Sequence, residues 1–597
     1  MQMDGRLTAL RELSQLRLIN IFNQIPGKKD LIIDAPLMKA LDRITGISVL
    51  RKHDVDKIFK LDSNAGQNSV NNQRLYLIMS DLISAKRVCD QVNAEQRKDV
   101  DYHIIVVPRK LAAIDQLLEE EGLWGRVTIH VYQWEPIQLD MGLISLELPS
   151  LFPQLFVDGD QTLLPAVAKS LWSLQMLLGR SQVTLTLGRY AKQVQSMTEV
   201  LMDQIGEPDK PQTDIGCIVL VDRDVDYAAS LLTPATYTSL MDEVLGIRSG
   251  VVELPKSDAK PDEKQTIGHL LSSEDEIYNQ IKNRHFSDVF SFLSAKAKQL
   301  SNEYDQSRKM ALHEMKQYVS SQLKTVMARK RALAMHIAGC EAVITAIGAR
   351  FESLQDMEQN MLEGTNRRSV QSYIEENIVT GGGGKLANLR LMCLLSLTQD
   401  GLFSEDAWSL KTQFLHAYGY HLLPGLHNLE NLGLLTTSSA GLGSGLVTGP
   451  VSDATGRLAN KVAQVVSLPK RSSFQVLRQK LKLFSANRED INLKQPTDMS
   501  YVYGGAYIPI ACQLVQLLIK KEVSFEDIVN QLIPGSSVTP SKPSIDFLPR
   551  SFIVYFIGGV TYAEVAAFQL LEKLTGTRII VASTSVMNGS TLIDSVL

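Results

Sequence analysis

The C-terminal end of the chain carries the pattern that most constrains its fold. An apolar strand at 552–559, an amphipathic helix at 561–574 and a second apolar strand at 578–584 follow one another directly. A strand–helix–strand unit this short cannot cover both faces of a sheet of its own. It must therefore complete a sheet begun elsewhere, and we expect the apolar strand at 216–221 to be its partner.

The N-terminal part of the chain alternates helix and strand. Residues 7–25 carry apolar side chains at helical spacing, and four short apolar strands follow, separated by helical stretches. This spacing predicts a parallel sheet covered by helices. The four strands of this N-terminal part are expected at 30–34, 74–80, 102–108 and 126–132. A second α/β block follows, with helices near 161–178 and 190–205.

From about residue 272 the pattern becomes helical over a long stretch. Apolar side chains recur every three or four residues on two successive segments, which predicts a long antiparallel hairpin at about 285–350. A glycine run at 381–384 ends the pattern, and the low-complexity stretch at 436–456 is expected to be mobile. The apolar positions are Phe286, Val289, Leu293, Ala297, Leu300, Tyr304, Met315, Val319, Leu323 and Val326.

These blocks predict an α/β protein with two parallel-sheet α/β domains and a large, mainly helical insert. The N-terminal domain covers 1–135. The middle domain is discontinuous and consists of 136–255 and 485–597. The insert covers 256–484.

Composition narrows the possible functions. Sixty-one basic and 65 acidic residues give a net charge of −4, which argues against nucleic-acid binding. The five cysteines include no Cys-x-x-Cys pair, so we expect reduced core residues without zinc or disulfides. We expect no signal peptide at the N-terminus, no lipidation signal at either end, and no apolar run that approaches the ~18 residues of a spanning helix. We therefore expect a cytoplasmic protein that contacts membranes only peripherally.

Two glycine-rich stretches fail as nucleotide-binding loops. "GGGGKL" at 381–386 has Val379 where a phosphate loop needs glycine and Leu386 where it needs serine or threonine. "GLGSG" at 441–445 lacks the Gly-x-Gly-x-x-Gly spacing. Both are therefore expected to be linkers.

The glycines after the strand at 552–559 resemble a dinucleotide-binding turn more closely. Gly558 and Gly559 are adjacent, however, and the third glycine of that pattern is absent. Thr561 and Glu564 fit a capping box, which engages the free N–H groups of the next helix within the protein. We therefore assign these four residues a structural role and expect no cofactor.

Acidic residues follow the apolar strand at 216–221, a position where α/β enzymes often place metal ligands. Asp222 and Asp226 flank the corner, with Arg223 beside them. A magnesium site would need more carboxylates and a phosphate-binding loop, whereas carboxylates here can accept backbone N–H bonds or pair with arginine. The chain also lacks a His-Glu-x-x-His pair and a Gly-x-Ser-x-Gly turn. We expect these three residues to be structural, with no catalytic or metal-binding residue.

Three segments, separated by the helical insert, resemble the SM family, the syntaxin-chaperone proteins of vesicle fusion. Other segments, among them "GDQTLL", "SYIEENI" and "LEEEGLWG", are similar to its class C vacuolar sorting group, in the B-type form. One departure concerns the family's Thr-Pro pair, because Ala229 and Ser230 stand in its place. The three segments are "LVDRDVDYAASLLTPATYTSLMDEVLGI", "DMSYVYGGAYIPIACQLVQ" and "FIVYFIGGVTYAEVAAFQLL".

The resemblance implies an arch-shaped, non-enzymatic tethering and fusion factor of endosome and lysosome traffic. It implies that the corner at Asp222 holds the middle domain against the insert, and that SNARE helices dock on the hairpin. We expect Lys324, Lys330 and Arg331 to contact the SNARE; the alternative is an ordinary solvated charged face. The expected location is cytoplasmic, on late endosome, lysosome or recycling endosome membranes, with a Rab GTPase as a further partner.

The resemblance also implies a docking site for a class C helical-solenoid subunit, of the sixteen-B type, within residues 410–435. Tyr418, Tyr420 and Leu423 would form it; the alternative is that they pack in the core of the insert. Two other functions stay open: an A-type subunit of the larger tethering complexes, and a nucleotide-dependent α/β enzyme. The final "SVL" matches a PDZ ligand, although we expect it to form the last turn of the fold.

Overall fold

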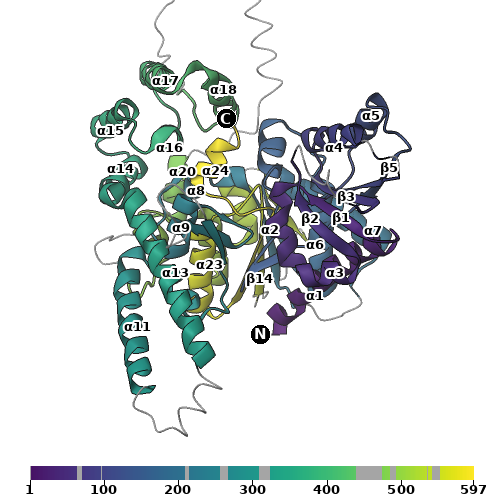
Figure 1. Cartoon of the computed structure of the whole chain (residues 1–597). Helices are drawn as coiled ribbons and strands as arrows, with labels where there is room; N and C mark the ends of the chain where they lie inside the picture. Colours follow the sequence, from purple (N-terminus) through teal and green to yellow (C-terminus); the bar gives the residue numbers. More distant parts are fainter. Residues whose placement is uncertain are drawn as a thin grey trace, which may run out of the picture.

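The computed structural model describes residues 2–62, 70–95, 97, 99–208, 214–255, 266–307, 323–437, 474–484, 492–533, 535–540 and 551–597. Figure 1 shows two helix-covered sheets side by side and a helical hairpin that projects from one side of them. Most of the low-complexity stretch at 436–456, and the apolar positions Met315 and Val319, lie outside the described residues.

The N-terminal sheet has five parallel strands in the order β2-β1-β3-β4-β5. Its side chains alternate between two hydrophobic clusters, with Leu75 and Leu77 in one and Tyr76 and Ile78 in the other, so both faces are buried. The four predicted strands and the first helix are confirmed. The elements are α1 (Gln2–Asn23), β1 (Lys29–Ile33), α2 (Ala35–Ile44), α3 (Ile47–Lys52), β2 (Val55–Lys60), β3 (Gln73–Met79), α4 (Leu82–Ala94), β4 (Asp101–Val107), α5 (Ala112–Glu120) and β5 (Val127–Val131).

The middle sheet joins segments from both sides of the insert. β9 (Cys217–Asp222) pairs in parallel with β14 (Ser551–Ile557), so that Asp222 lies opposite Ile557. Every residue of both strands is buried. The prediction that the C-terminal unit completes the sheet begun at 216–221 is therefore confirmed, whereas the domain boundaries themselves stay a prediction.

The sheet has the strand order β13-β8-β9-β14-β15-β7-β6, with β13 and β6 antiparallel to their neighbours. Its helices include those predicted near 161–178 and 190–205. The further elements of this part are β6 (Ile137–Asp140), β7 (Leu143–Ser145), α6 (Leu164–Leu178), β8 (Val183–Leu187), α7 (Arg189–Ile205), α8 (Ala228–Leu231), α9 (Tyr237–Leu245), α21 (Ile510–Ile519), α22 (Phe525–Asp527), β13 (Ser537–Thr539), α23 (Tyr562–Thr575), β15 (Arg578–Ser583) and α24 (Gly589–Asp594).

Several strands did not stand out in the sequence. β2 falls in a stretch that we expected to be helical. It is an edge strand with one fully buried side chain, so its sequence has no continuous apolar run that would have identified it as a strand. β8 is short and alternates with threonine. A separate antiparallel sheet consists of β10 (Ile247–Arg248), β11 (Val251–Pro255) and β12 (Thr266–Leu270).

The insert is built from helices. α11 (Phe286–Ser307) and α13 (Leu323–Ile347) contact each other along the projecting hairpin, as predicted (Figure 1). The glycine run lies between two helices, as expected. The other helices are α10 (Glu276–Ile281), α14 (Phe351–Glu363), α15 (Arg367–Thr380), α16 (Gly384–Thr398), α17 (Ser404–Tyr418), α18 (Leu423–Asn431) and α20 (Phe474–Leu481).

One helical stretch in the described residues, Thr325–Glu363, is long and apolar enough to cross a membrane, with a mean hydropathy of 1.6 in its most apolar window. The expectation that no apolar run approaches that length is therefore wrong. The stretch comprises most of α13 together with α14, so it belongs to the insert. Only 28% of the window is buried, which leaves much of an apolar helix surface uncovered.

Candidate functional site

Asp222, at the end of β9, occupies the N-terminus of helix α7. Its carboxylate accepts hydrogen bonds from the backbone N–H groups of Tyr190, at 2.8 Å, and Ala191, at 2.7 Å. Gly188 permits this approach, because a Cβ there would lie 2.3 Å from Asp222 Oδ2. Burial, with Asp224 nearby, raises the pKa of Asp222 well above its ordinary value. The position where an α/β fold would bind a phosphate is therefore filled by the protein's own carboxylate.

Arg223 forms a buried ion pair with Glu564 of α23. Its Nη1 lies 2.8 Å from Oε2, and its Nη2 lies 3.0 Å from Oε1. Glu564 also forms the predicted capping box with Thr561, which is confirmed in both directions. The N-terminus of α23, like that of α7, is therefore engaged within the chain.

The two glycines before α23 are required by close packing. A Cβ on Gly558 would lie 2.7 Å from the Phe156 ring, and one on Gly559 would lie 2.6 Å from Met587 Sδ. Both residues have positive φ angles, +100° and +117°. These glycines admit neighbouring side chains of the protein, which agrees with the structural role expected for them.

Asp226 completes the corner. It accepts hydrogen bonds from the backbone N–H of Ala229 at 3.0 Å, from the Tyr507 hydroxyl at 3.0 Å and from the Ile510 backbone N–H at 2.9 Å. Arg223 and Asp226 thus connect 136–255 with 485–597, whereas the hydrogen bonds of Asp222 stay within 136–255. The expectation that this corner holds the middle domain against the insert is therefore corrected, because it ties together the two halves of the middle domain.

The contact between the middle domain and the insert is made next to this corner. Thr233 donates its backbone N–H and its hydroxyl to Glu358 of α14, at 2.9 and 2.6 Å. Arg390 of α16 donates to the Leu231 carbonyl at 2.6 Å, to the Thr233 hydroxyl at 2.9 Å and to Glu243. Sequence reasoning missed this network. A buried arginine within the apolar segment "LRLMCLLSL" was the available signal.

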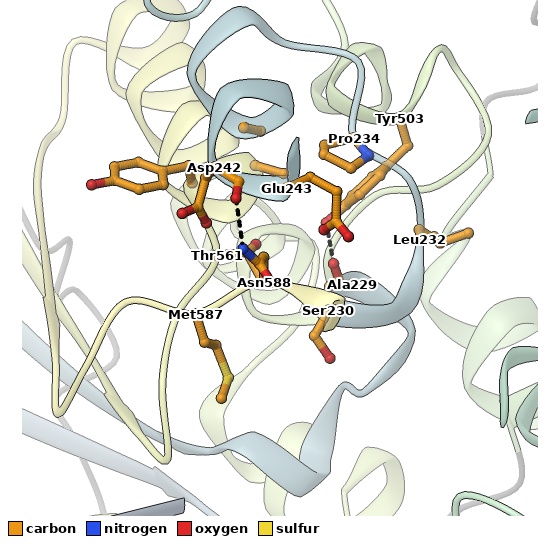
Figure 2. Close-up of a pocket in the computed structure, with 14 residues that line it drawn as sticks. Ala229, Ser230, Leu232, Pro234, Asp242, Glu243, Tyr503, Thr561, Met587 and Asn588 are labelled. Carbon is orange, nitrogen blue, oxygen red and sulfur yellow. Dashed lines mark hydrogen bonds between the residues drawn. The ribbon is translucent and has the colours of Figure 1, made fainter. Parts of the chain in front are cut away.

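The cavity beside this network is small. It is lined by residues from α8, α9, α23 and the loop before α24 (Figure 2), and it encloses about 10 Å³. That volume holds about one water molecule, far less than a ligand pocket. Burial raises the pKa of Asp242, one of its lining residues, to about 7. Among the described residues, no group of three or more His, Cys, Asp or Glu side chains could hold a metal ion.

Two of the three basic side chains predicted to contact a SNARE belong to the residues that the structure describes. Lys330 and Arg331 are exposed on α13. The neighbouring Arg329 is engaged, with its Nε 3.0 Å from Glu276 Oε2. The side chain of Lys324 lies outside the described residues.

The base of α13 is fixed to the middle domain. His336 is fully buried, with Nδ1 2.9 Å from the Tyr237 hydroxyl and Nε2 3.1 Å from Asp275 Oδ2. One turn further, a Cβ on Gly339 would lie 3.2 Å from the same hydroxyl. The hairpin is therefore anchored through one face of α13, and its exposed face is held in a defined direction.

The predicted docking residues between α17 and α18 divide into two kinds. Tyr420 and Leu423 are exposed, at 63% and 55%. Tyr418 is half-buried, its ring lies 4.9 Å from the tilted ring of Phe414, and its hydroxyl accepts a hydrogen bond from Asn388 at 2.8 Å. Tyr420 and Leu423 are therefore available to a partner, whereas Tyr418 packs within the insert. The C-terminal Leu597 lies against Gly425 of α18, where a Cβ would approach it to 2.6 Å.

These features define a scaffold of two α/β domains, with the N-termini of α7 and α23 engaged by its own side chains, and a helical insert that carries exposed apolar side chains. The Sec1 family model matches residues 29–595. The chain belongs to the Sec1 family.

Similar proteins support both the vacuolar sorting group and the B-type form that the sequence predicted. The chain is 35% identical to human vacuolar protein sorting-associated protein 33B, over 98% of this chain and 96% of that protein. It is 29% identical to the rat 33A protein, over 99% of this chain and 98% of the relative. The resemblance to the SM family and to its B-type vacuolar sorting form is confirmed.

Solved structures share the fold. The Unc18–syntaxin 1 complex from Monosiga brevicollis has a TM-score of 0.59 at 14% identity, covering 98% of both chains. The SM protein Vps45 in complex with the Qa SNARE Tlg2 has a TM-score of 0.58 at 16% identity, covering 98% of this chain and 97% of that one. The predicted SM fold, with parallel-sheet α/β regions and a helical insert, is confirmed.

Proposed function

We propose that this protein regulates SNARE-mediated membrane fusion in endosome and lysosome traffic. It binds SNARE helices on the hairpin and a class C helical-solenoid subunit, of the sixteen-B type, on the α17–α18 face. Its full-length similarity to the 33B proteins supports this function, as do the SNARE complexes formed by two proteins of the same fold.

The observation that carries the SNARE proposal is the uncovered apolar surface of α13. Met327 and Ala334 are exposed two turns apart on one face of this helix, and Ile344 is exposed further along, about a quarter of a turn round it. A helix with such a face packs well against another amphipathic helix. Lys330 and Arg331 beside this face would attract an acidic SNARE bundle and steer its approach.

Charge reversal on the hairpin tests the SNARE proposal. The triple variant Lys324→Glu, Lys330→Glu, Arg331→Glu should weaken SNARE binding at low salt while leaving the melting temperature near that of the wild type, because exposed charges contribute under ~1 kcal/mol each to folding. Charge reversal of Lys520 and Lys521, exposed after α21 in the middle domain, is the matched control. Equal SNARE affinity for the triple variant and the wild type would remove the hairpin from the mechanism.

The solenoid surface is supported by the exposed pair Tyr420 and Leu423. An exposed tyrosine such as Tyr420 often carries a large part of the binding energy of an interface. The higher identity to 33B than to 33A supports a partner of the B-type complex. Affinity pull-down with mass spectrometry separates the two, since an A-type protein would recover the subunits of the larger tethering complexes.

The remaining parts of the proposal concern location. We propose that the protein is cytoplasmic and reaches late endosome, lysosome or recycling endosome membranes peripherally, through its partners and a Rab GTPase. Fractionation in the presence and absence of the solenoid subunit tests this part. Membrane association that persists without the partner would contradict it.

A further inference from the structure

Two histidines face each other on neighbouring strands of the N-terminal sheet. His103 belongs to β4 and His130 to β5, the strand that forms one edge of the sheet (Figure 1). Nδ1 of His103 lies 3.3 Å from Nε2 of His130, and the two rings are tilted by 32° with their centroids 5.5 Å apart. Both residues are only partly buried, so an ion from solvent can reach the pair.

Neighbouring side chains fix which nitrogen of His103 carries the proton. Gln73 donates its amide N–H to Asp101 Oδ2 at 3.0 Å, because a carboxylate only accepts hydrogen bonds. This orientation turns Gln73 Oε1 toward His103 Nε2, at 3.1 Å, so Nε2 is the nitrogen that donates. In the neutral ring Nδ1 therefore carries a lone pair, and it faces His130. A metal-binding histidine is typically held by such a contact to its other ring nitrogen.

The surroundings keep both rings neutral, as the ligands of a metal ion must be. Burial, followed by the neighbouring His130, lowers the pKa of His103, and burial lowers the pKa of His130. Among the fixed charges nearby, Asp101 raises the pKa of His103 more than Lys29 lowers it. The pair therefore offers uncharged nitrogen ligands in surroundings whose fixed charges do not oppose a cation.

We propose that His103 and His130 together bind one Zn²⁺ ion. Zinc binds imidazole nitrogens at ~2.0–2.1 Å in tetrahedral geometry, which places two such nitrogens about 3.3 Å apart. Nδ1 and Nε2 have this separation, which is longer than the ~2.9–3.0 Å typical of an N–H hydrogen bond to oxygen. A small rotation about the side-chain torsions, which are broad for histidine rings, directs both lone pairs at one ion.

The site differs from structural zinc sites in being open. Those sites have four protein ligands, whereas this one has two, so water fills the remaining positions and the affinity is moderate. The ion ties the edge strand β5 to β4, which stabilises the edge of the N-terminal sheet because the folded chain binds it and the unfolded chain has no preformed site. This inference is independent of the proposed function.

Calorimetric titration of the full chain with ZnCl₂, after removal of any histidine tag, tests the site. We expect one Zn²⁺ per chain and a higher melting temperature with the ion bound. His130→Ala should weaken binding by at least about 10-fold, and Gln73→Ala, which removes only the support of His103, by about 10-fold. His427→Ala is the matched control, since His427 is exposed on α18, and it should bind Zn²⁺ as the wild type does. Equal affinity of His130→Ala and the wild type would overturn the inference.

X-ray absorption at the zinc edge of the loaded wild type does not depend on how a variant folds. We expect two imidazole nitrogens at ~2.0–2.1 Å, together with oxygen ligands from water. A sulfur ligand, or a spectrum without imidazole scattering, would overturn the inference. Absence of Zn²⁺ binding by the wild type would also overturn it, and would mean that the two rings are joined by an ordinary hydrogen bond.

Discussion

Arg223 and Glu564 are joined by two hydrogen bonds, at 2.8 and 3.0 Å, although 341 positions of sequence separate them. Both side chains are fully buried, Arg223 at the end of β9 and Glu564 in the first turn of α23. The pair closes the middle domain across the whole insert. It lies beside the paired strands β9 and β14, which join the two α/β segments into one sheet.

Removing the charge of Glu564 should therefore destabilise the middle domain strongly. Glu564→Gln keeps the shape of the side chain but removes the charge that pairs directly with the buried Arg223 guanidinium, which should lower the free energy of unfolding by ~3–5 kcal/mol. Glu572→Gln is the control, since Glu572 pairs with Arg578 at a partly exposed site and should cost ~1 kcal/mol or less. Chemical denaturation of the two variants would show the difference. Equal stability of both would mean that the buried pair contributes little.

Asp222→Ala should act on stability and not on a reaction. It leaves the N–H groups of Tyr190 and Ala191 without their acceptor, so we expect a loss of ~1–3 kcal/mol and a lower melting temperature. The wild type should not be stabilised by a magnesium–nucleotide complex, because the N-termini of α7 and α23 are already engaged. An unchanged melting temperature together with loss of a metal-dependent turnover would contradict this role and support the enzyme alternative.

The sheets and their connection could be predicted from sequence because parallel strands buried on both faces give continuous apolar runs. β9 and β14 are such strands, and their pairing followed from the need to cover a short C-terminal unit. β2 could not be recognised in the same way, since an edge strand alternates with charged side chains. The apolar character of α13 was also underestimated, because Lys330, Arg331 and Glu341 interrupt a stretch that is apolar on average.

The candidate site was predictable only in part, because burial and partners depend on three-dimensional contacts. The capping box at Thr561 and Glu564 is a local pattern, and it was identified correctly. The partner of Arg223 and the contact of Thr233 with Glu358 join residues far apart in sequence, so no local pattern reveals them. For the same reason the sequence could not separate the half-buried Tyr418 from the exposed Tyr420.

The stability of the protein should depend on pH through Asp242. Burial raises the pKa of this carboxyl to about 7, whereas an unfolded aspartate titrates at ~3.9. The folded state therefore binds the proton more tightly, so the contribution of this group is fully present below pH ~4 and is lost as the pH rises to about 7.

Asp242→Asn should remove that loss. The amide oxygen can still accept the Ile247 N–H, which lies 2.8 Å from the carboxylate. The variant should match the wild type near pH 4 and exceed its stability by ~2–4 kcal/mol at pH 8, measured as the difference between melting curves across that range. Asp203→Asn, on the exposed face of α7, is the control. A difference that does not change with pH would contradict the raised pKa.

The most discriminating prediction compares two tyrosines two positions apart. Tyr420 is exposed at 63% and makes a ring contact with His416, so Tyr420→Asp should release the sixteen-B type solenoid subunit at a cost of ~2 kcal/mol or more in binding, while melting and SNARE binding stay near wild type. Tyr418 is packed beside Phe414 and hydrogen-bonded to Asn388, so Tyr418→Asp should instead lower the melting temperature by burying an unpaired charge. Co-purification, calorimetric binding and thermal melting of both variants separate the two effects. If Tyr420→Asp aggregates, or retains the partner undiminished, the docking site must lie elsewhere on the insert.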